Sequence, residues 1–255
     1  MLIAQITDMH VGEVAETSRG TIDTLARLER AVAHIVDLRP APDLVLATGD
    51  LTRDGAREEY AALRHVLSRL PMPYSLIPGN HDRREPLAAA FEDMPGFNGA
   101  RDFLHHAIEG FPLRILALDT LDPGREGGAL CARRLDWIEE RLAEVRGRPT
   151  LIAMHHPPFA VGVPMFDNLG FEGGDAFGAL VARHPEIEAI VCGHVHRAIS
   201  LRWQGTAVHV TPATGYQYPL DMAAERVPRV DEPPACRLLH WLPETGLVAH
   251  LSYVD

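Results

Sequence analysis

The stretch "ATGDLTRDG", residues 47–55, ends an apolar run with a glycine and then places a carboxylate. The run before it, "LVLA" at residues 44–47, has the composition of a buried strand. An aspartate at the end of such a strand either forms a turn or binds a ligand. A ligand site requires that other strands end in the same way, so the remaining strand ends decide between the two interpretations.

The composition limits the possible classes of protein. The chain has 255 residues, of which 46% are hydrophobic, and this is enough for one large α/β domain with a small appendage. The formal net charge of -11 argues against a nucleic-acid polymer as partner, because nucleic-acid-binding proteins usually present a basic face. Every basic side chain is an arginine, so no lysine can form a Schiff base or anchor a phosphate loop.

Cysteine usage and the N-terminal sequence bear on location. Cys131, Cys192 and Cys236 are odd in number and show no paired spacing, which is typical of a reducing compartment. The apolar run in "MLIAQITD" is too short for a signal peptide, and no stretch is long enough to span a bilayer. We therefore expect a cytoplasmic protein that does not contact a membrane.

Apolar runs alternate with helical patterns along the chain, and this predicts βαβ units in a largely parallel sheet covered by helices. The predicted strands are residues 2–7, 44–48, 74–77, 103–109, 113–118, 150–154, 188–192, 200–203, 206–211, 237–241 and 247–253. The predicted helices are residues 20–38, 56–70 (capped by Asp54), 85–92, 133–145 and 175–183.

The alternation of predicted strands and helices is interrupted near the C-terminus. Residues 213–235 contain four prolines and mixed charges, which favours a cap or dimerisation insert over a part of the core. We therefore expect a catalytic domain at 1–212, this insert at 213–235, and a C-terminal β-hairpin at 236–255 that returns to the catalytic domain.

Five predicted strands end in aspartate, asparagine or histidine, in the strings "TDMH", "TGD", "PGNHD", "MHHPP" and "CGHVH". Ligands of open α/β sheets bind outside the carboxyl ends of the strands. One such string alone is weak evidence, but five in order favour a metal site over five turns. The residues that would meet there are Asp8, His10, Asp50, Asn80, His155, His194 and His196.

The spacing of these residues supports a shared site. Asp8 and His10 are two residues apart, as are His194 and His196, so in an extended chain each pair would point to one side. The glycines at 49, 79 and 193 would let the backbone turn sharply and approach an ion. Adjacent histidines should point in opposite directions, so only one of those at 155 and 156 is expected to be a direct ligand.

Carboxylate, imidazole and amide donors without a thiolate suit Mn, Fe, Zn or Co. Seven ligands are too many for one such ion, whereas two divalent metal ions bridged by Asp50 would use them all. Two ions would also balance the charge of a phosphodiester and lower the pKa of bound water, which supplies a metal-bound hydroxide as the nucleophile.

The blocks "DMH", "GD", "GNHD", "MHHPP" and "GHVH" resemble those of the calcineurin-like metallophosphoesterases. Within that superfamily, "PDLVLATGDLTRDGAREEY" and "YSLIPGNHD" are most similar to the bacterial class III cyclic-nucleotide phosphodiesterases and the related glycerophosphodiesterase. The resemblance runs from Met1 to about Thr211 and implies an α/β fold, a four-layer αββα sandwich. The chain departs from the protein phosphatases of the superfamily, which have "GDxxDRG" and "GNHE" where this sequence has "GDLTRDG" and "GNHD".

The resemblance also implies a role for each matched residue. Asp8, His10, Asp50 and His196 would hold the first ion, and Asp50, Asn80, His155 and His194 the second. His155 is preferred to His156 because the family motif has its ligand two residues before the proline, and the role of His156 stays open. The implied catalytic residues are His81, Asp50 and Asn80, with His81 facing the phosphate; the structural alternative for His81 is an imidazole pinned to a neighbouring carboxylate.

The function implied is hydrolysis of small phosphodiesters such as cyclic nucleotides or glycerophosphodiesters. A phosphomonoesterase on the same metal centre is the alternative, followed by a non-catalytic metal-binding scaffold. The acidic composition disfavours a nuclease. Relatives use the segment matching residues 213–235 for subunit contact, so a homodimer or higher homo-oligomer is expected, with a plain surface loop as the alternative.

Overall fold

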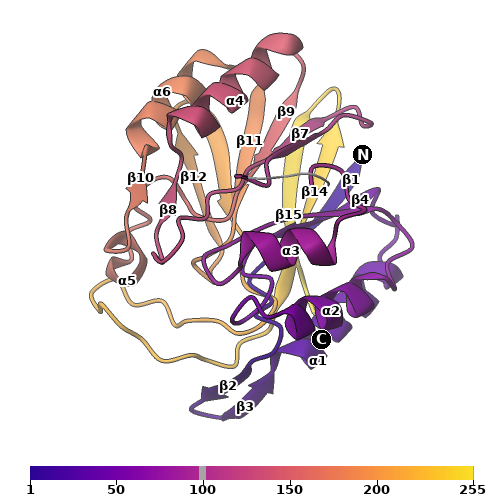
Figure 1. The fold of residues 1–255 in the computed structure, drawn as a ribbon, viewed down its shortest axis with the longest axis vertical. Helices are drawn as coiled ribbons and strands as arrows, with labels where there is room; N and C mark the ends of the chain where they lie inside the picture. Colours follow the sequence, from indigo (N-terminus) through magenta and orange to yellow (C-terminus); the bar gives the residue numbers. More distant parts are fainter. Residues whose placement is uncertain (98–101, 255) are drawn as a thin grey trace.

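The computed structural model describes residues 1–97 and 102–254. Two β-sheets lie face to face, and a layer of helices covers the outer side of each (Figure 1). One apolar cluster fills the space between the sheets. Each sheet also packs against its own helices through a further apolar cluster. The predicted four-layer αββα sandwich is confirmed.

The first sheet has five strands and contains both parallel and antiparallel pairs. β1, β4 and β5 are parallel to one another, while β14 is antiparallel to β1 and to β15. In spatial order the strands are β15 (Gly246–Tyr253), β14 (Ala235–Leu242), β1 (Leu2–Ile6), β4 (Leu44–Thr48) and β5 (Tyr74–Ile77). All five residues of β4 are buried, in agreement with its continuous apolar run.

The second sheet has six strands. Its four inner strands are parallel, and antiparallel partners close both edges. In spatial order the strands are β12 (Ile199–Trp203), β13 (Thr206–Val210), β11 (Ile187–Cys192), β9 (Thr150–Ala153), β7 (Arg114–Ala117) and β6 (His106–Ile108). The predicted C-terminal hairpin is confirmed as β14–β15. The strands predicted at 103–109 and 113–118, and at 200–203 and 206–211, also pair as antiparallel neighbours, β6–β7 and β12–β13.

Successive side chains of a strand point alternately into the two apolar layers on either side of the sheet, as expected from the strand period of two. In β1, Ile3 faces the other sheet, whereas Ala4 faces the helices. The helices that pack on the first sheet are α1 (Thr24–Asp37), α2 (Arg57–Leu67) and α3 (Arg84–Ala90), and those that pack on the second are α4 (Ala132–Glu144) and α6 (Gly174–Arg183). A short helix, α5 (Pro164–Asp167), lies in the loop before α6.

The structure corrects two predicted helix starts. The helix expected from residue 20 begins at Thr24, because Gly20–Asp23 forms strand β3 and pairs with β2 (Val14–Thr17). Asp23 then caps α1 by accepting hydrogen bonds from the amides of Leu25 and Ala26.

The helix expected at residues 56–70 is α2, which is shorter at both ends, and Asp54 does not cap it. The cap comes instead from inside the helix: the Glu59 carboxylate accepts from the amides of Asp54 and Ala56, at 3.1 and 3.0 Å. The small parallel pair β8 (Gly128–Ala129) and β10 (Phe171–Glu172) was not predicted.

The five strands that end in polar residues do not belong to one sheet. β1, β4 and β5 lie in the first sheet, and β9 and β11 lie in the second. Within each sheet the strand ends are joined by backbone hydrogen bonds, from Asp8 to Gly49 and from Gly193 to His155, both 3.0 Å. The ends of the two sheets meet where the amide of His194 donates to the carboxylate of Asp8. The expectation of one largely parallel sheet was therefore wrong. The site lies where the parallel strands of both sheets have their carboxyl ends.

Residues 213–235 run as a long extended segment past α5 to the start of β14 (Figure 1). Gln217 and Val230 join the two arms of this segment through backbone hydrogen bonds. The division of the chain at 212 and 235 stays a prediction. Among the described helices, none combines the length and the apolar character needed to cross a bilayer.

Candidate metal centre

The polar residues at the strand ends share an unusual backbone conformation. Positive φ angles occur at Asp8 (53°), His10 (47°), Asp50 (46°), His194 (72°) and His196 (55°). This left-handed conformation costs a non-glycine residue about 1 kcal/mol or more, so it persists only where the surroundings enforce it. The backbone at these residues is therefore not extended as expected. Asp8 and His10 still share a group of side chains, whereas His194 and His196 join different groups.

Hydrogen bonds between the turns enforce this backbone. The amide of His10 donates to the carbonyl of Asp50 at 2.9 Å, which joins the end of β1 to the end of β4. The amide of His194 donates to both carboxylate oxygens of Asp8, at 3.1 and 3.0 Å. The second sheet is thereby fixed to the first through a side chain of the site itself.

Glycine is required for space at all three of these strand ends, and a Cβ at Gly49 would lie 2.4 Å from His155 Nδ1. A Cβ at Gly79 would lie 2.3 Å from the Asp50 amide nitrogen, and one at Gly193 would lie 2.0 Å from the Thr7 hydroxyl. Their φ angles lie outside the left-handed region, so the sharp turn expected at all three glycines occurs only at Gly49, where φ is 94°.

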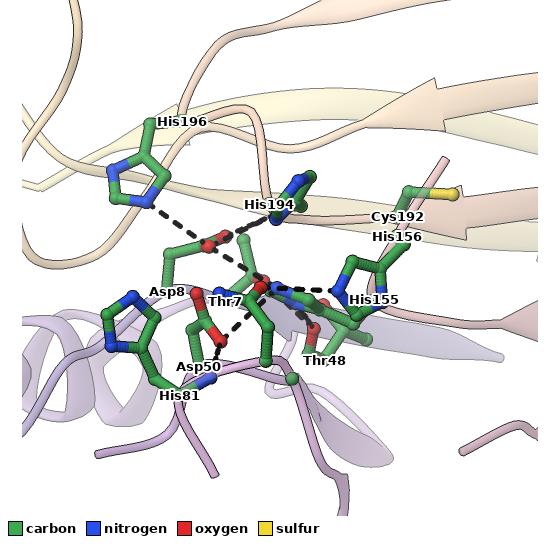
Figure 2. Close-up of polar contacts among 12 residues, drawn as sticks. Thr7, Asp8, Thr48, Asp50, His81, His155, His156, Cys192, His194 and His196 are labelled. Atoms are coloured by element: carbon green, nitrogen blue, oxygen red, sulfur yellow. Dashed lines mark hydrogen bonds and ion pairs between the residues drawn. The ribbon is translucent and has the colours of Figure 1, made fainter. Parts of the chain in front are cut away.

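The imidazoles of the site surround the carboxylates of Asp8 and Asp50 (Figure 2). Within each of four groups, the potential ligand atoms lie no more than 4.8 Å apart. The groups are Asp8 with His10 and His196, Asp8 with Asp50 and His155, His10 with Asp50 and His81, and His155 with His156 and His194. The structure therefore brings together all the predicted aspartates and histidines.

Two imidazole nitrogens in this cluster are buried without a hydrogen-bond partner among the described residues. The Nδ1–H of His155 donates to the carbonyl of Thr48 at 2.8 Å, which leaves Nε2 bare and 3.4 Å from Asp50 Oδ1. The Nδ1 of His10 is the second such atom. A histidine whose one nitrogen is fixed by a carbonyl and whose other is bare has the arrangement of a metal ligand.

The ionisation of the cluster also suits metal binding. Burial alone would raise the pKa of Asp50, but His155 and His10 outweigh it and hold that pKa well below its usual value. Burial lowers the pKa of His10 and of His194 to about 3, so both imidazoles are neutral at pH 7 and can donate a lone pair. Burial would lower the pKa of His155 too, but Asp50 and Asp8 raise it to about 9. In the metal-free chain, this proton offsets part of the charge of the two carboxylates.

His156 has its own set of partners. Its ring is nearly perpendicular to that of His155, with centroids 4.7 Å apart, so the two adjacent side chains do not point in opposite directions as expected. The Thr120 hydroxyl lies 2.8 Å from Nδ1 of His156, and Asn80 Oδ1 lies 3.2 Å from its Nε2. Both nitrogens are therefore engaged, and His156 holds the side chain of Asn80 in place.

His81 lies at the open side of the cluster. Its Nδ1–H donates to the Arg53 carbonyl at 2.8 Å, and its backbone amide donates to Asp50 Oδ1 at 3.0 Å. The imidazole is exposed, and its hydrogen-bond partner is a carbonyl and not the carboxylate of the structural alternative. Burial would lower its pKa, but Asp50 raises it above the usual value.

Asp82, the last residue of "GNHD", was not among the predicted site residues. Its buried carboxylate accepts from the amides of Leu51 and Gly79, at 3.1 and 2.8 Å, and from the hydroxyl of Tyr60 at 3.0 Å. It thereby joins the loop after β4 to the loop after β5. Its position in the string "GNHD", two residues after the predicted ligand Asn80, was a signal that could have identified it.

A cap was one of the two roles expected for residues 213–235, but the sequence did not indicate which of these residues touch the cluster. The Nδ1–H of His196 donates to the Tyr216 carbonyl at 2.6 Å, and the Tyr216 ring stacks on His10 with centroids 5.1 Å apart. Arg229 lies 4.6 Å from the Tyr216 ring centre and pairs with the buried Glu13 at 2.7 Å. The first part of this segment therefore supports the site directly.

The donor set fits a pair of divalent ions. Two ionised carboxylates buried side by side are unfavourable without compensating positive charge. The bare Nε2 of His155 beside Asp50 points to a missing ligand bond. The Nε2 atoms of His10 and His196 face each other at 3.2 Å, next to the two carboxylates. Nitrogen and oxygen donors without a thiolate favour ions such as Mn, Fe, Zn or Co.

Comparison with known proteins agrees with this geometry. A family model described as calcineurin-like phosphoesterase matches residues 1–198, which is most of the chain. The chain belongs to the calcineurin-like phosphoesterase family. The predicted resemblance is confirmed, and with it the class of enzyme, a metal-dependent hydrolase of phosphodiesters.

Two curated relatives show the range of names within this family. Glycerophosphodiester phosphodiesterase GpdQ of Enterobacter lignolyticus is 33% identical over 259 residues, covering 99% of this chain and 93% of the relative. The 3',5'-cyclic adenosine monophosphate phosphodiesterase CpdA of Escherichia coli K12 is 28% identical over 216 residues, covering 85% of this chain and 77% of the relative.

Solved structures share the fold at low sequence identity. A dimetal phosphatase from Danio rerio superposes with a TM-score of 0.73 at 13% identity, covering 100% of this chain and 99% of that one. A purple acid phosphatase from yellow lupin gives 0.71 at 16% identity and covers 99% of this chain and 51% of that one. These two structures support the αββα architecture.

Replacing Asp50 by alanine should remove both ions and nearly all activity, because Asp50 contacts both groups of histidines. Elemental analysis after dialysis measures the metal content directly. Asp54→Ala, an exposed aspartate in the same loop, is the control and should retain its ions. Two tightly bound ions in the Asp50 variant would show that this carboxylate does not bridge them.

Proposed function

We propose that this chain is a dinuclear-metal-dependent phosphodiesterase that hydrolyses small phosphodiesters, such as cyclic nucleotides or glycerophosphodiesters. The observation that carries the proposal is the pair of buried, ionised carboxylates of Asp8 and Asp50 beside the partnerless Nε2 of His155. The names of the two curated relatives support the choice of a diester as substrate.

In this proposal the seven ligands divide into two sets that share Asp50. Asp8, His10, Asp50 and His196 hold the first ion, and Asp50, Asn80, His155 and His194 hold the second. The grouping of Asp8 with His10 and His196 supports the first set. For the second set, the fixed Nδ1 and bare Nε2 of His155 favour this residue over His156, both of whose nitrogens have partners.

When bound, the two ions would act as Lewis acids and would lower the pKa of water for attack on phosphorus. Hydrolysis forms one bond from phosphorus to the water oxygen and breaks one ester bond, so the departing alkoxide needs a proton. His81 is suited to supply it, because Arg53 fixes its Nδ1 while its exposed imidazole keeps Nε2 available. His156 orients the side chain of Asn80 through the 3.2 Å contact between its Nε2 and Asn80 Oδ1.

The proposal extends to location and assembly. We expect a cytoplasmic protein, and the three cysteines, all unpaired, support a reducing compartment. We also expect a homodimer or higher homo-oligomer that uses residues 213–235. The exposed side chains of Leu220 and Met222 in that segment, 57% and 68% accessible, support a subunit contact.

The substrate class can be tested by comparing a diester with a monoester. The metal-free protein is reconstituted with Mn²⁺, and kcat/KM is measured for bis(4-nitrophenyl) phosphate and for 4-nitrophenyl phosphate near neutral pH. We expect a clear preference for the diester. A preference for the monoester would identify a phosphomonoesterase on the same centre, and no turnover of either with two ions bound would favour a scaffold.

The role of His81 can be tested through the leaving group. His81→Ala should lower kcat about 100-fold for a diester with a poor alkoxide leaving group, which needs a proton. The loss should be much smaller for 4-nitrophenolate, which departs without one. Equal losses for both leaving groups would contradict proton donation by His81.

A further inference from the structure

Two hollows flank the metal centre, and they meet at the contact between His156 and Asn80. The first, of about 210 Å³, extends from His156 and His194 towards α5. The second, of about 510 Å³, extends from Asn80 and His81, in the loop before α3, towards residues 121–124. A phosphodiester bound at the ions has two ester arms, and each hollow is in position to receive one.

The first hollow is mainly apolar. Its walls include Phe159, Phe166 and Phe171. Its one carboxylate, Asp167, is already engaged, because its oxygens accept from the amides of Val161 and Gly162 at 2.6 and 3.0 Å. This hollow therefore has no arginine among its described lining residues and offers no positive charge to an anionic group.

The second hollow is lined by three arginines, which differ in how far they are neutralised. Arg84 makes two hydrogen bonds to Asp119, at 2.6 and 2.8 Å, and is fully paired. Arg53 reaches only the exposed carboxylate of Asp54, at 3.5 Å. Arg83 has no carboxylate within 4.0 Å among the described residues. The third acid here, Asp82, is buried and saturated by protein donors.

The free guanidinium of Arg83 is notable in a chain with 35 acidic and 24 basic side chains. Its stem packs over Gly55, where an added Cβ would lie 2.6 Å from Arg83 Cγ, so the side chain is supported on one side. A guanidinium binds a carboxylate or a phosphate through two parallel hydrogen bonds. The difference in charge between the two hollows would therefore distinguish between the two arms of a diester.

We infer that the hollow beside Arg83 and Arg53 is a subsite for an anionic group, a carboxylate or a second phosphate, on one ester arm of the substrate. This inference rests on the proposed phosphodiesterase function. It favours acyclic diesters, because both ester bonds of a cyclic nucleotide join the same sugar and leave no second anionic arm. The other arm, in the apolar hollow, carries no charge.

Two synthetic diesters of equal length test this subsite. One is 3-carboxypropyl 1-naphthyl phosphate, and the other is its neutral amide, 3-carbamoylpropyl 1-naphthyl phosphate. Both release 1-naphtholate, so their kcat/KM values differ only through the remote group. With Mn²⁺ bound, the wild type should favour the carboxylate about tenfold, and the preference should fall as salt is added.

Variants assign the preference to Arg83. In Arg83→Gln the ratio of the two kcat/KM values should fall towards one, and in Arg83→Glu it should fall below one. Arg146→Gln, which removes an exposed arginine from the loop after α4, is the control for lost charge and should keep the wild-type ratio.

The outcomes separate this inference from the proposed function. A wild-type ratio near one, or a ratio that survives Arg83→Gln, would overturn the subsite while leaving the phosphodiesterase intact. The same holds if bis(4-nitrophenyl) phosphate is hydrolysed but neither naphthyl diester is. If bis(4-nitrophenyl) phosphate itself is not turned over with two ions bound, the proposed function fails, and the subsite fails with it.

Discussion

The burial of two carboxylates at one point is the constraint on which the rest of this structure depends. Asp8 and Asp50 share a group with His155 in which the potential ligand atoms lie within 4.8 Å, and all three side chains are buried. Such charges are unfavourable inside a protein unless opposite charge and hydrogen bonds compensate for them. Around these residues the chain provides five more imidazoles and backbone amides that donate hydrogen bonds, and together they form a donor set for metal ions.

The same constraint explains the strained backbone. Left-handed φ angles at five of the predicted ligands cost several kcal/mol together, and they are held by hydrogen bonds that link the strand ends of both sheets. Because the amide of His194 donates to Asp8, the position of one ligand depends on another from the opposite sheet. The core of the sandwich therefore fixes the site, and the site in turn joins the two halves of the sandwich.

Much of this could be predicted from sequence, because the signals are local. Apolar runs followed by Asp, Asn or His identified the five strand ends, and the resemblance to a family supplied the second sheet. Side-chain direction could not be predicted: the expected extended pairs fail at His194 and His196, since left-handed residues reverse the direction of the chain. The contact of Tyr216 with His10 and His196 was also hidden, because it joins segments far apart in sequence and no periodic pattern marks it.

The choice of substrate could likewise not be predicted from the sequence, as the two hollows show. The motifs around Asn80 and His81 indicate phosphoester chemistry, whereas the identity of the ester arms depends on side chains such as Arg83 and Phe166 that lie outside the motifs. The folded structure is needed to show which of these charged side chains are already paired and which are free to bind a substrate.

The central claim is that these residues hold two ions bridged by Asp50. Anomalous X-ray diffraction from crystals of the Mn²⁺-loaded protein tests it most directly. We expect two anomalous peaks about 3.5–4 Å apart, with Asp50 between them and His155, not His156, bound to the second. A single peak, or two peaks without Asp50 between them, would contradict the account.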